Sequence, residues 1–465
     1  MSNRYCIIGA GASGLAVAKT FAERGIPFDC IERETEIGGL WNPATPSGVV
    51  YETCHMLSSK EFSGYLDFPM SEDLPVFPSH SQALDYLKSY AAHFGLERHI
   101  QLGKTVSRAE RTPDGWMVRI EGDDQPRHYK GLVIANGHHC EPRWPEYRGT
   151  FAGEYIHSRD YRSPKQLTGK RVLVIGGGNS ACDVAIDAAH HGAISAISLR
   201  RGYYFVPKFL FGQPIDDVYE FVERFRLPRG LRQFLYGLSH WLFTGPPERF
   251  GLPKPDHGIL ESHTTITSDL PNMVSHGRIA AKPDVASFDG NTVHFTDGTQ
   301  MTADMVVCAT GYRLAAPFID RSELYLPDGH PNLFVQTFHP ERDDLFVAGL
   351  VQGNGSMWRL AELQAKLISS YIVAKEYGDA SAERFASMKR ATAEDVEVQK
   401  RSFVKSKRHR LETDFHVYRR RLEKLLKGFG KFAEAPMPSS VVGLPLPTPA
   451  YKRDEVGTRV SEAAE

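Results

Sequence analysis

Gly9-Ala10-Gly11-Ala12-Ser13-Gly14 has the spacing G-x-G-x-x-G and decides the fold of the N-terminal region. The run Tyr5 to Ile8 before it is short and apolar, as in a buried strand. Residues 15–24 after it carry apolar side chains at helical spacing, and Phe28 to Ile31 returns to strand character. We therefore expect one βαβ unit, with the glycines in the turn between its first strand and its helix.

The residues of this turn suit a dinucleotide. Gly9 permits the tight turn, Gly11 lets backbone N–H groups approach a pyrophosphate at the helix N-terminus, and Gly14 allows close packing of helix and strand. Glu32 ends the next strand, where a carboxylate can accept hydrogen bonds from ribose hydroxyls. The stretch predicts a dinucleotide site, and a glycine turn without function is the alternative.

A second copy of the pattern follows. It begins at Arg171 to Ile175, passes through Gly176-Gly177-Gly178-Asn179-Ser180-Ala181, continues as a helix-like stretch over residues 182–189 and returns to strand at residues 194–199. This copy ends in Ala where the first ends in Gly, which the dinucleotide pattern permits. The sequence therefore predicts two mononucleotide-type folds.

The two copies differ after their second strand, where the first has Glu32 and the second has Arg200-Arg201. A carboxylate would repel the 2′-phosphate of NADP, whereas guanidinium groups can bind it with two hydrogen bonds. We expect NADPH at the second site. Two solvated surface arginines are the alternative.

Two further strand-like runs, residues 132–137 and 305–311, each close on a glycine and flank the second copy. We expect an α/β fold of two Rossmann-like dinucleotide-binding domains, with the NADP domain inserted in the FAD domain. The aromatic and proline-rich stretch 203–273 does not fit the βαβ rhythm and is expected to be an insertion that lines or covers a site. The expected domains are residues 1–164 with 311–442 (FAD), residues 165–310 (NADP, including the insertion) and an extended tail over residues 443–465.

The composition excludes several classes of protein. The formal net charge is -1, so no overall field attracts nucleic acid or acidic lipid. The apolar stretch Phe234 to Phe243 is shorter than the roughly 18 residues that a membrane span requires, and we interpret it as a buried or interfacial helix. The cysteines stand singly, and no histidine cluster has convincing ligand spacing, so we expect reduced thiols, no metal and a cytoplasmic protein. The cysteines are Cys6, Cys30, Cys54, Cys140, Cys182 and Cys308.

Ile37-Gly38-Gly39-Leu40-Trp41 resembles the segment that follows the ribose acid in many FAD-binding oxidoreductases, which favours FAD at the first site. FAD and NADPH in one chain imply hydride transfer to the flavin and then delivery of electrons to an acceptor. Disulfide reductases share this plan but need a redox cysteine pair, which the sequence lacks. Molecular oxygen is the natural remaining acceptor.

The stretch Phe151 to Tyr161 matches F-x-G-x-x-x-H-x-x-x-Y, a signature of flavin-containing monooxygenases, and the chain resembles that family in order over nearly its whole length. Tyr161, rather than Trp, is closer to this family than to the type I Baeyer-Villiger enzymes. Other segments that resemble the family are Ala309-Thr310-Gly311-Tyr312, Ser58-Ser59-Lys60-Glu61, Asp67-Phe68-Pro69, Gly349-Leu350-Val351-Gln352, Glu362-Leu363-Gln364, and His409, Glu412, Asp414 and Tyr418.

The resemblance implies an NADPH-dependent flavin monooxygenase whose C4a-hydroperoxyflavin oxygenates a soft nucleophile, an amine nitrogen or a sulfide, with a small molecule and oxygen as partners. Within the family the signature histidine, here His157, couples domains and is not a base. The expected FAD residues are Gly9, Gly11, Ala12, Ser13, Gly14, Glu32, Gly39, Leu40, Trp41, Val106 and Gln352. The expected NADP residues are Gly176, Gly178, Asn179, Ser180, Asp183, Arg200 and Arg201. The linker residues are Phe151, Gly153, His157, Tyr161, Thr310, Gly311 and Tyr312.

At one position the chain departs from the family. Many members carry Asn immediately before the residue that matches Ser58, and this chain has Leu57, which cannot donate a hydrogen bond. His55 and Ser58 are the nearby polar candidates for a catalytic role. The open alternatives are Baeyer-Villiger oxygenation of a ketone, an NADPH oxidase that releases hydrogen peroxide, and a non-catalytic NADPH sensor. Class relatives often form homodimers, so a homodimer is compatible with the resemblance.

Overall fold

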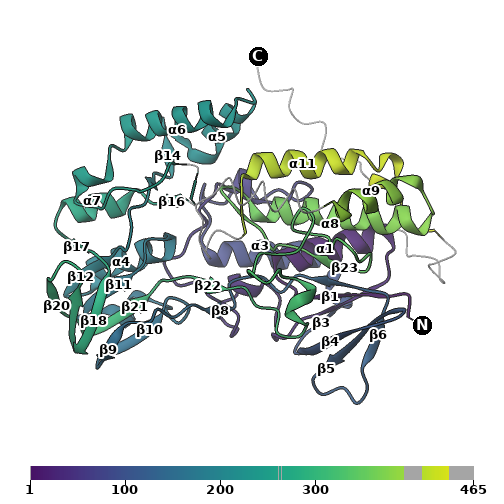
Figure 1. The fold of residues 1–465 in the computed structure, drawn as a ribbon, viewed down its shortest axis with the longest axis horizontal. Coiled ribbons are helices and arrows are strands. Elements are labelled where there is room, and N and C mark those ends of the chain that lie inside the picture. Colours follow the sequence, from purple (N-terminus) through teal and green to yellow (C-terminus); the bar gives the residue numbers. More distant parts are fainter. Residues whose placement is uncertain (1, 260, 263, 392–410, 439–465) are drawn as a thin grey trace.

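The computed structural model describes residues 2–259, 261–262, 264–391 and 411–438, and Figure 1 shows that they form two lobes side by side. His409 and the tail expected at residues 443–465 lie outside these described residues. The first lobe contains the chain's beginning and its C-terminal helices, and the second lobe contains the middle of the chain. Each lobe carries one of the two glycine fingerprints.

The first lobe is built on a parallel sheet of strand order β23-β7-β1-β2-β3. The buried apolar run Tyr5–Ile8 forms β1, and the helix α1 (Ala12–Arg24) starts directly after Gly11. Because β1 pairs on one side with β2 and on the other with β7, the first fingerprint lies at the centre of the sheet. The other strands are β2 (Phe28–Ile31), β3 (Ile100–Gln101), β7 (Gly131–Ile134) and β23 (Leu345–Val347).

Helices cover one face of this sheet and a small antiparallel sheet covers the other (Figure 1). On the helical face, apolar residues of α1 and of the long helix α8 (Met357–Glu376) belong to one buried cluster. On the other face, Trp116 and Val118 pack with Ile8 and Leu132 of the parallel sheet. The remaining elements are α2 (Lys60–Ser63), α3 (His80–His93), α9 (Ala380–Arg390), α11 (Phe415–Lys427), β4 (Val106–Thr112), β5 (Gly115–Ile120) and β6 (Arg127–Tyr129).

The second lobe repeats the plan with a parallel sheet of order β10-β21-β11-β12-β17. Here β11 (Arg171–Ile175) leads into the helix α4 (Asn179–His191), which begins directly after Gly178. A four-stranded sheet covers the face opposite α4, and the two faces have separate buried clusters. The strands are β10 (Glu154–His157), β12 (Ile194–Ser198), β17 (Ile279–Lys282) and β21 (Met305–Cys308), with β9 (Arg148–Phe151), β18 (Val285–Gly290), β19 (Thr292–Phe295) and β20 (Gln300–Thr302) in the covering sheet.

Two parallel sheets, each with a strand, a glycine turn and a helix at its centre, confirm the predicted fold class of two Rossmann-like units, one nested in the other. The strands β9 and β10 lie before the expected boundary at residue 165, yet they pair with β18 and β21 of the second lobe. We therefore propose that the second unit begins near residue 148. The sequence pattern around these strands is too irregular to show this pairing.

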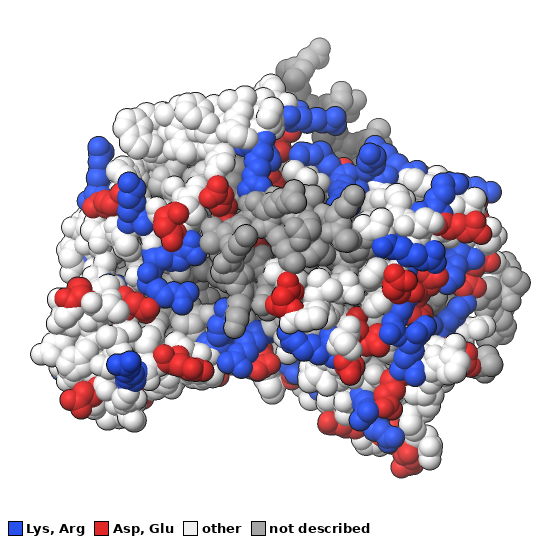
Figure 2. All heavy atoms as spheres, in the orientation of Figure 1, with Lys and Arg blue, Asp and Glu red and all other residues white. Residues whose placement is uncertain are grey.

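The stretch 203–273 leaves the βαβ rhythm, as expected, and carries a helical hairpin of α5 (Ile215–Glu223) and α6 (Arg229–Phe243). Phe234 to Phe243 is helical, as expected. Of the two settings expected for it, buried or interfacial, full burial is excluded, since Phe234 and Trp241 are 63% and 58% exposed. Figure 2 shows a nearly uncharged surface where Figure 1 places α6. The other elements are β13 (Phe205–Val206), β14 (Phe209–Leu210), β15 (Gln213–Pro214), β16 (Thr265–Ile266) and α7 (Asp269–Ser275).

Two short strand pairs lie outside the main sheets, one between the lobes and one within the first lobe. The linkers between the lobes pair as β8 (Glu141–Pro142) with β22 (Tyr312–Arg313), so the chain crosses between lobes at one place in both directions. The pair β24 (Gln352–Gly353) with β25 (Glu412–Thr413) leads into α11. Among the described helices, none is long and apolar enough to cross a membrane.

Candidate active site

A cavity of about 1110 Å³ lies between the lobes, and both glycine fingerprints open onto it. Most of the residues predicted from the sequence line this one cavity. They are Gly9, Gly11, Ala12, Ser13, Glu32, Gly39, Leu40, Trp41, Val106, Gln352, Gly176, Gly178, Asn179, Ser180, Asp183, Arg200, Arg201, His55, Ser58, Thr310, Gly311 and Tyr312. Gly14, Phe151, Gly153, His157 and Tyr161 do not line it.

The first fingerprint has the tight geometry that its glycines suggested. Gly9 has a φ of +107°, and a Cβ there would lie 2.6 Å from the carbonyl oxygen of Ala135. A Cβ at Gly14 would lie 1.9 Å from the carbonyl oxygen of Gly9, so α1 rests directly on the turn. At Gly11, by contrast, the nearest atom to an added Cβ is the Cα of Gly39 at 3.6 Å. Gly11 is thus free of close protein contacts on the side where a pyrophosphate would approach.

Glu32 lies against the same turn. One oxygen of its carboxylate accepts the backbone N–H of Ala10 at 2.5 Å, and the other accepts the N–H of Glu34 at 3.0 Å. Burial raises the pKa of Glu32 above its ordinary value, and the two N–H donors act in the opposite direction. These bonds hold the carboxylate of Glu32 beside the first fingerprint, and its role toward a ribose stays a prediction.

The second fingerprint repeats this geometry and is covered by the insertion. A Cβ at Gly176 would lie 2.4 Å from the carbonyl oxygen of Ala309. This matches the first fingerprint, where a Cβ at Gly9 would lie 2.6 Å from the carbonyl oxygen of Ala135. The side chain of Asn179 accepts the backbone N–H of Ile266 at 2.8 Å, and Thr265 donates to the carbonyl of Gly177 at 2.8 Å. The strand β16 of the insertion therefore lies along the second dinucleotide turn.

The two arginines after β12 are not equivalent. Arg201 is held by Asp256 at 2.7 Å and contacts a ring nitrogen of His257 at 3.0 Å. Arg200 is exposed on the cavity wall and, in the described part of the chain, forms neither a hydrogen bond nor an ion pair. Arg200 is therefore the guanidinium that is available to a phosphate.

Asp183, on α4 of the second lobe, lines the cavity and contacts the first lobe. Its carboxylate accepts the hydroxyl of Tyr51 at 2.6 Å, and burial raises the pKa of Asp183 to about 6. One turn further along α4, Asp187 accepts hydroxyl hydrogen bonds from Thr53 and Tyr161, each at 2.7 Å. These bonds attach α4 of the second lobe to residues 51–53 of the first, and they give signature residue Tyr161 a structural role.

His157 is completely buried at the end of β10. Its Nε2 lies 3.1 Å from the carbonyl oxygen of Gly311, and its Nδ1 accepts the backbone N–H of Arg159. Burial lowers the pKa of His157. Because Nδ1 accepts a hydrogen bond, we assign the ring proton to Nε2, which faces the carbonyl oxygen of Gly311. A histidine that joins the two linkers and does not reach the cavity agrees with a coupling role.

The two candidates near Leu57 are poorly suited to catalysis. His55 is exposed, and its Nδ1 lies 3.0 Å from the carbonyl oxygen of Thr53. Ser58 lines the cavity, but its hydroxyl shares a hydrogen bond of 2.6 Å with Ser63. Their catalytic assignment stays a prediction.

The insertion forms a further wall of the cavity, as expected for the stretch 203–273, but the residues of this wall were not predicted individually. Ile215, Asp216 and Tyr219 of α5 line the cavity, and Asp216 accepts both the backbone N–H and the hydroxyl of Ser59. Asn354 and His416, from the C-terminal part of the first lobe, also line it. The only sequence signal for α5 was its place within an aromatic insertion, which fixes neither its position nor its orientation.

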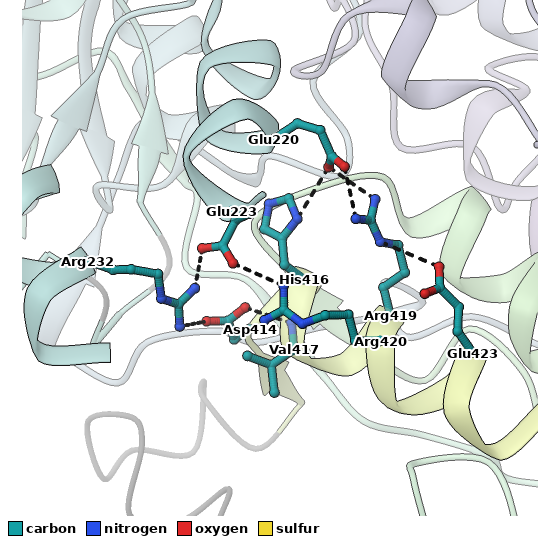
Figure 3. Close-up of polar contacts among 9 residues, drawn as sticks. All are labelled: Glu220, Glu223, Arg232, Asp414, His416, Val417, Arg419, Arg420 and Glu423. Atoms are coloured by element: carbon teal, nitrogen blue, oxygen red, sulfur yellow. Dashed lines mark hydrogen bonds and ion pairs between the residues drawn. The ribbon is translucent and has the colours of Figure 1, made fainter. Parts of the chain in front are cut away.

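Ion pairs attach this wall to α11 (Figure 3). Arg232 of α6 pairs with Glu223 of α5 and, at 2.8 Å, with Asp414 at the start of α11. Glu223 also pairs with Arg420, while Arg419 binds both oxygens of Glu220, at 2.9 and 3.0 Å. The hairpin of the insertion is thus fastened across the cavity to the first lobe.

Comparisons with known proteins agree with this arrangement. Residues 2–431 match the family model described as "Flavin-binding monooxygenase-like". The chain is 32% identical over 436 residues to "Flavin-containing monooxygenase 5" of Rattus norvegicus, with 89% of this chain and 80% of that protein covered.

Solved structures share the fold. S-allyl-L-cysteine S-oxygenase from Allium sativum matches with a TM-score of 0.65 at 20% identity, over 95% of this chain and 96% of that one. The open crystal structure of cyclohexanone monooxygenase matches with a TM-score of 0.65 at 18% identity, over 92% and 99% of the two chains. This chain belongs to the flavin-binding monooxygenase-like family and is an FAD- and NADPH-dependent monooxygenase.

Proposed function

We propose that this chain holds FAD at Gly9 to Gly14 and NADPH at Gly176 to Ala181, and transfers one oxygen atom from O2 to a sulfide or amine. The observation that carries the proposal is the single cavity onto which both fingerprints open and which continues to the wall formed by α5. When bound, the two cofactors supply hydride transfer and the activation of oxygen. The chain's residues orient the cofactors and exclude water from the space between them.

The residues between the fingerprints support a preference for partly apolar substrates. Met56, Phe62 and Ile215 line the cavity where the insertion meets residues 56–63. On the same wall, Ser59 binds one carboxylate oxygen of Asp216, Oδ2, whereas the buried Oδ1 has no partner among the described residues. A thioether or an amine with apolar substituents fits this space.

Product analysis with isotopic oxygen tests the proposal. The purified protein with FAD and NADPH is incubated under 18O2 with methyl phenyl sulfide, N,N-dimethylaniline or cyclohexanone. We expect the sulfoxide or the N-oxide to contain one 18O atom. A lactone as the only product, or NADPH consumption that ends entirely in hydrogen peroxide, would contradict the proposed function.

Arg200 gives a prediction for the nicotinamide cofactor. A charged hydrogen bond contributes about 1.5 to 3 kcal/mol, so R200A should raise the KM for NADPH by roughly ten- to a hundredfold and leave the KM for NADH nearly unchanged. R201A is the matched control, because Arg201 is already held by Asp256. An equal loss of affinity for NADPH and NADH in R200A would show that Arg200 does not bind the 2′-phosphate.

We also propose that the enzyme works in the cytoplasm. All six cysteines are unpaired, as expected in a reducing compartment. A homodimer stays a prediction, and sedimentation of the FAD-loaded protein would test it.

A further inference from the structure

We propose that the side-chain amide of Asn354 donates a hydrogen bond to the reacting oxygen atom in the cavity. Leu57 cannot make this hydrogen bond, because its side chain has no donor. The inference rests on the proposed function and assigns one residue within the same site. It is carried by the position of Asn354, by the free donor of its amide and by its packing against the segment that follows Leu57.

Asn354 lies within a stretch of cavity wall that begins beside the first fingerprint and continues to Trp358. At the start of this stretch, Gly349 lies so close to α1 that an added Cβ would be 2.0 Å from Oγ of Ser13. Gln352 and Gly353 then run along the cavity as β24, fixed by pairing with β25. The next residue, Asn354, contacts Thr264 of the insertion. Asn354 therefore lies where this wall of the first lobe meets the insertion.

The amide of Asn354 is held at its oxygen only. Oδ1 accepts the hydroxyl of Thr264 at 3.4 Å, and the Thr264 side chain is buried. Nδ2 donates to no residue in the described part of the chain, although its residue is half-buried in the cavity wall. Because an amide nitrogen carries two donors, both remain available to a bound molecule.

The same segment packs against the one that contains Leu57. Ser356 donates to the backbone carbonyl of Ser63 at 3.1 Å, and Arg359 donates to that of Gly64 at 3.0 Å. Leu57 and Asn354 both line the cavity. From this packing we infer that the amide of Asn354 faces the same part of the cavity as Leu57. The amide nitrogen of Asn136, which also lines the cavity, is already bonded to the carbonyl of Ala315 at 2.9 Å.

The experiment uses the FAD-loaded protein with three variants, N354L, N354D and L57N/N354L. Each protein is reduced with NADPH without oxygen and mixed with oxygen, and the lifetime of the transient flavin absorption is followed together with hydrogen peroxide. Loss of one such donor should shorten the lifetime about tenfold or more and raise the peroxide yield in N354L and N354D. An amide restored at position 57 should return the lifetime of L57N/N354L toward that of the natural protein.

One binding measurement and one stability measurement separate this role from a structural one. The Kd for NADP+, obtained by titrating the oxidised flavin spectrum, and the Tm should change little in N354D, which has nearly the same shape as Asn354. An unchanged lifetime in both single variants would overturn the inference, as would a short lifetime without recovery in L57N/N354L. If the natural protein itself oxygenates no sulfide or amine, the proposed function fails instead.

Discussion

Replacing Gly14 by alanine should abolish FAD binding and destabilise the first lobe. The added Cβ would lie 1.9 Å from the carbonyl oxygen of Gly9, so α1 must move away from the turn by more than an ångström. Overpacking of this kind costs about 3 kcal/mol or more, and it also displaces the helix N-terminus that faces the pyrophosphate. Absorbance at 450 nm per protein and the Tm would measure the two effects.

Gly11→Ala is the matched variant. Its Cβ meets no protein atom closer than 3.6 Å, so the fold and the Tm of the FAD-free protein should stay nearly unchanged. FAD should nevertheless be lost, because the methyl group occupies the space into which the pyrophosphate must come. If G11A kept its FAD, the first fingerprint would not be the FAD site.

Glu223→Ala should loosen the attachment of the insertion hairpin to α11, which the pairs Arg232–Asp414 and Glu220–Arg419 still hold. Glu223 and Arg232 are 3% and 6% exposed in their side chains. Because Arg232 keeps Asp414 as a partner, the cost should stay below the roughly 3 to 5 kcal/mol of a buried charge left unpaired. Arg420 loses its contact with Glu223 at the same time. We expect faster proteolysis within residues 224–229, a lower Tm, and more hydrogen peroxide per NADPH as water enters the cavity.

Glu220 is the control for this variant, since it lies on the same helix and pairs with the same α11. Its side chain and that of Arg419 are 29% and 22% exposed, so water screens the pair, and E220A should cost no more than about 1 kcal/mol. Equal losses of stability in E223A and E220A would show that burial of the Arg232 pair has no special part in fastening the hairpin.

The parts of the fold that could be predicted are those that depend on neighbouring residues. A strand, a glycine turn and a helix are adjacent in the chain, so both fingerprints, Glu32 and Arg200 could be located from sequence alone. The linker signature was equally local, and the structure explains it through the contact of His157 with Gly311.

The parts that could not be predicted depend on contacts between distant segments. Nothing local shows that β10 pairs with β21, some 150 residues later, or which residues of the insertion line the cavity. The apolar stretch 234–243 indicated the helix correctly but not which face was covered, because Tyr236 and His240 are buried while Trp241 is exposed. Asn354 was missed for the same reason, since its partner Thr264 comes from the insertion.

Because one sheet is nested in the other along the chain, the two lobes become complete at different times during synthesis. The second lobe is complete when β21 leaves the ribosome at Cys308, because its strands come from residues 148–308. The first sheet still lacks β23, and its helical core still lacks α8 and α11. A nascent chain therefore folds its middle first, while β1 and α1, made earliest, wait with an exposed apolar face for the C-terminal third. We expect chaperones that bind nascent chains to be needed most over this interval.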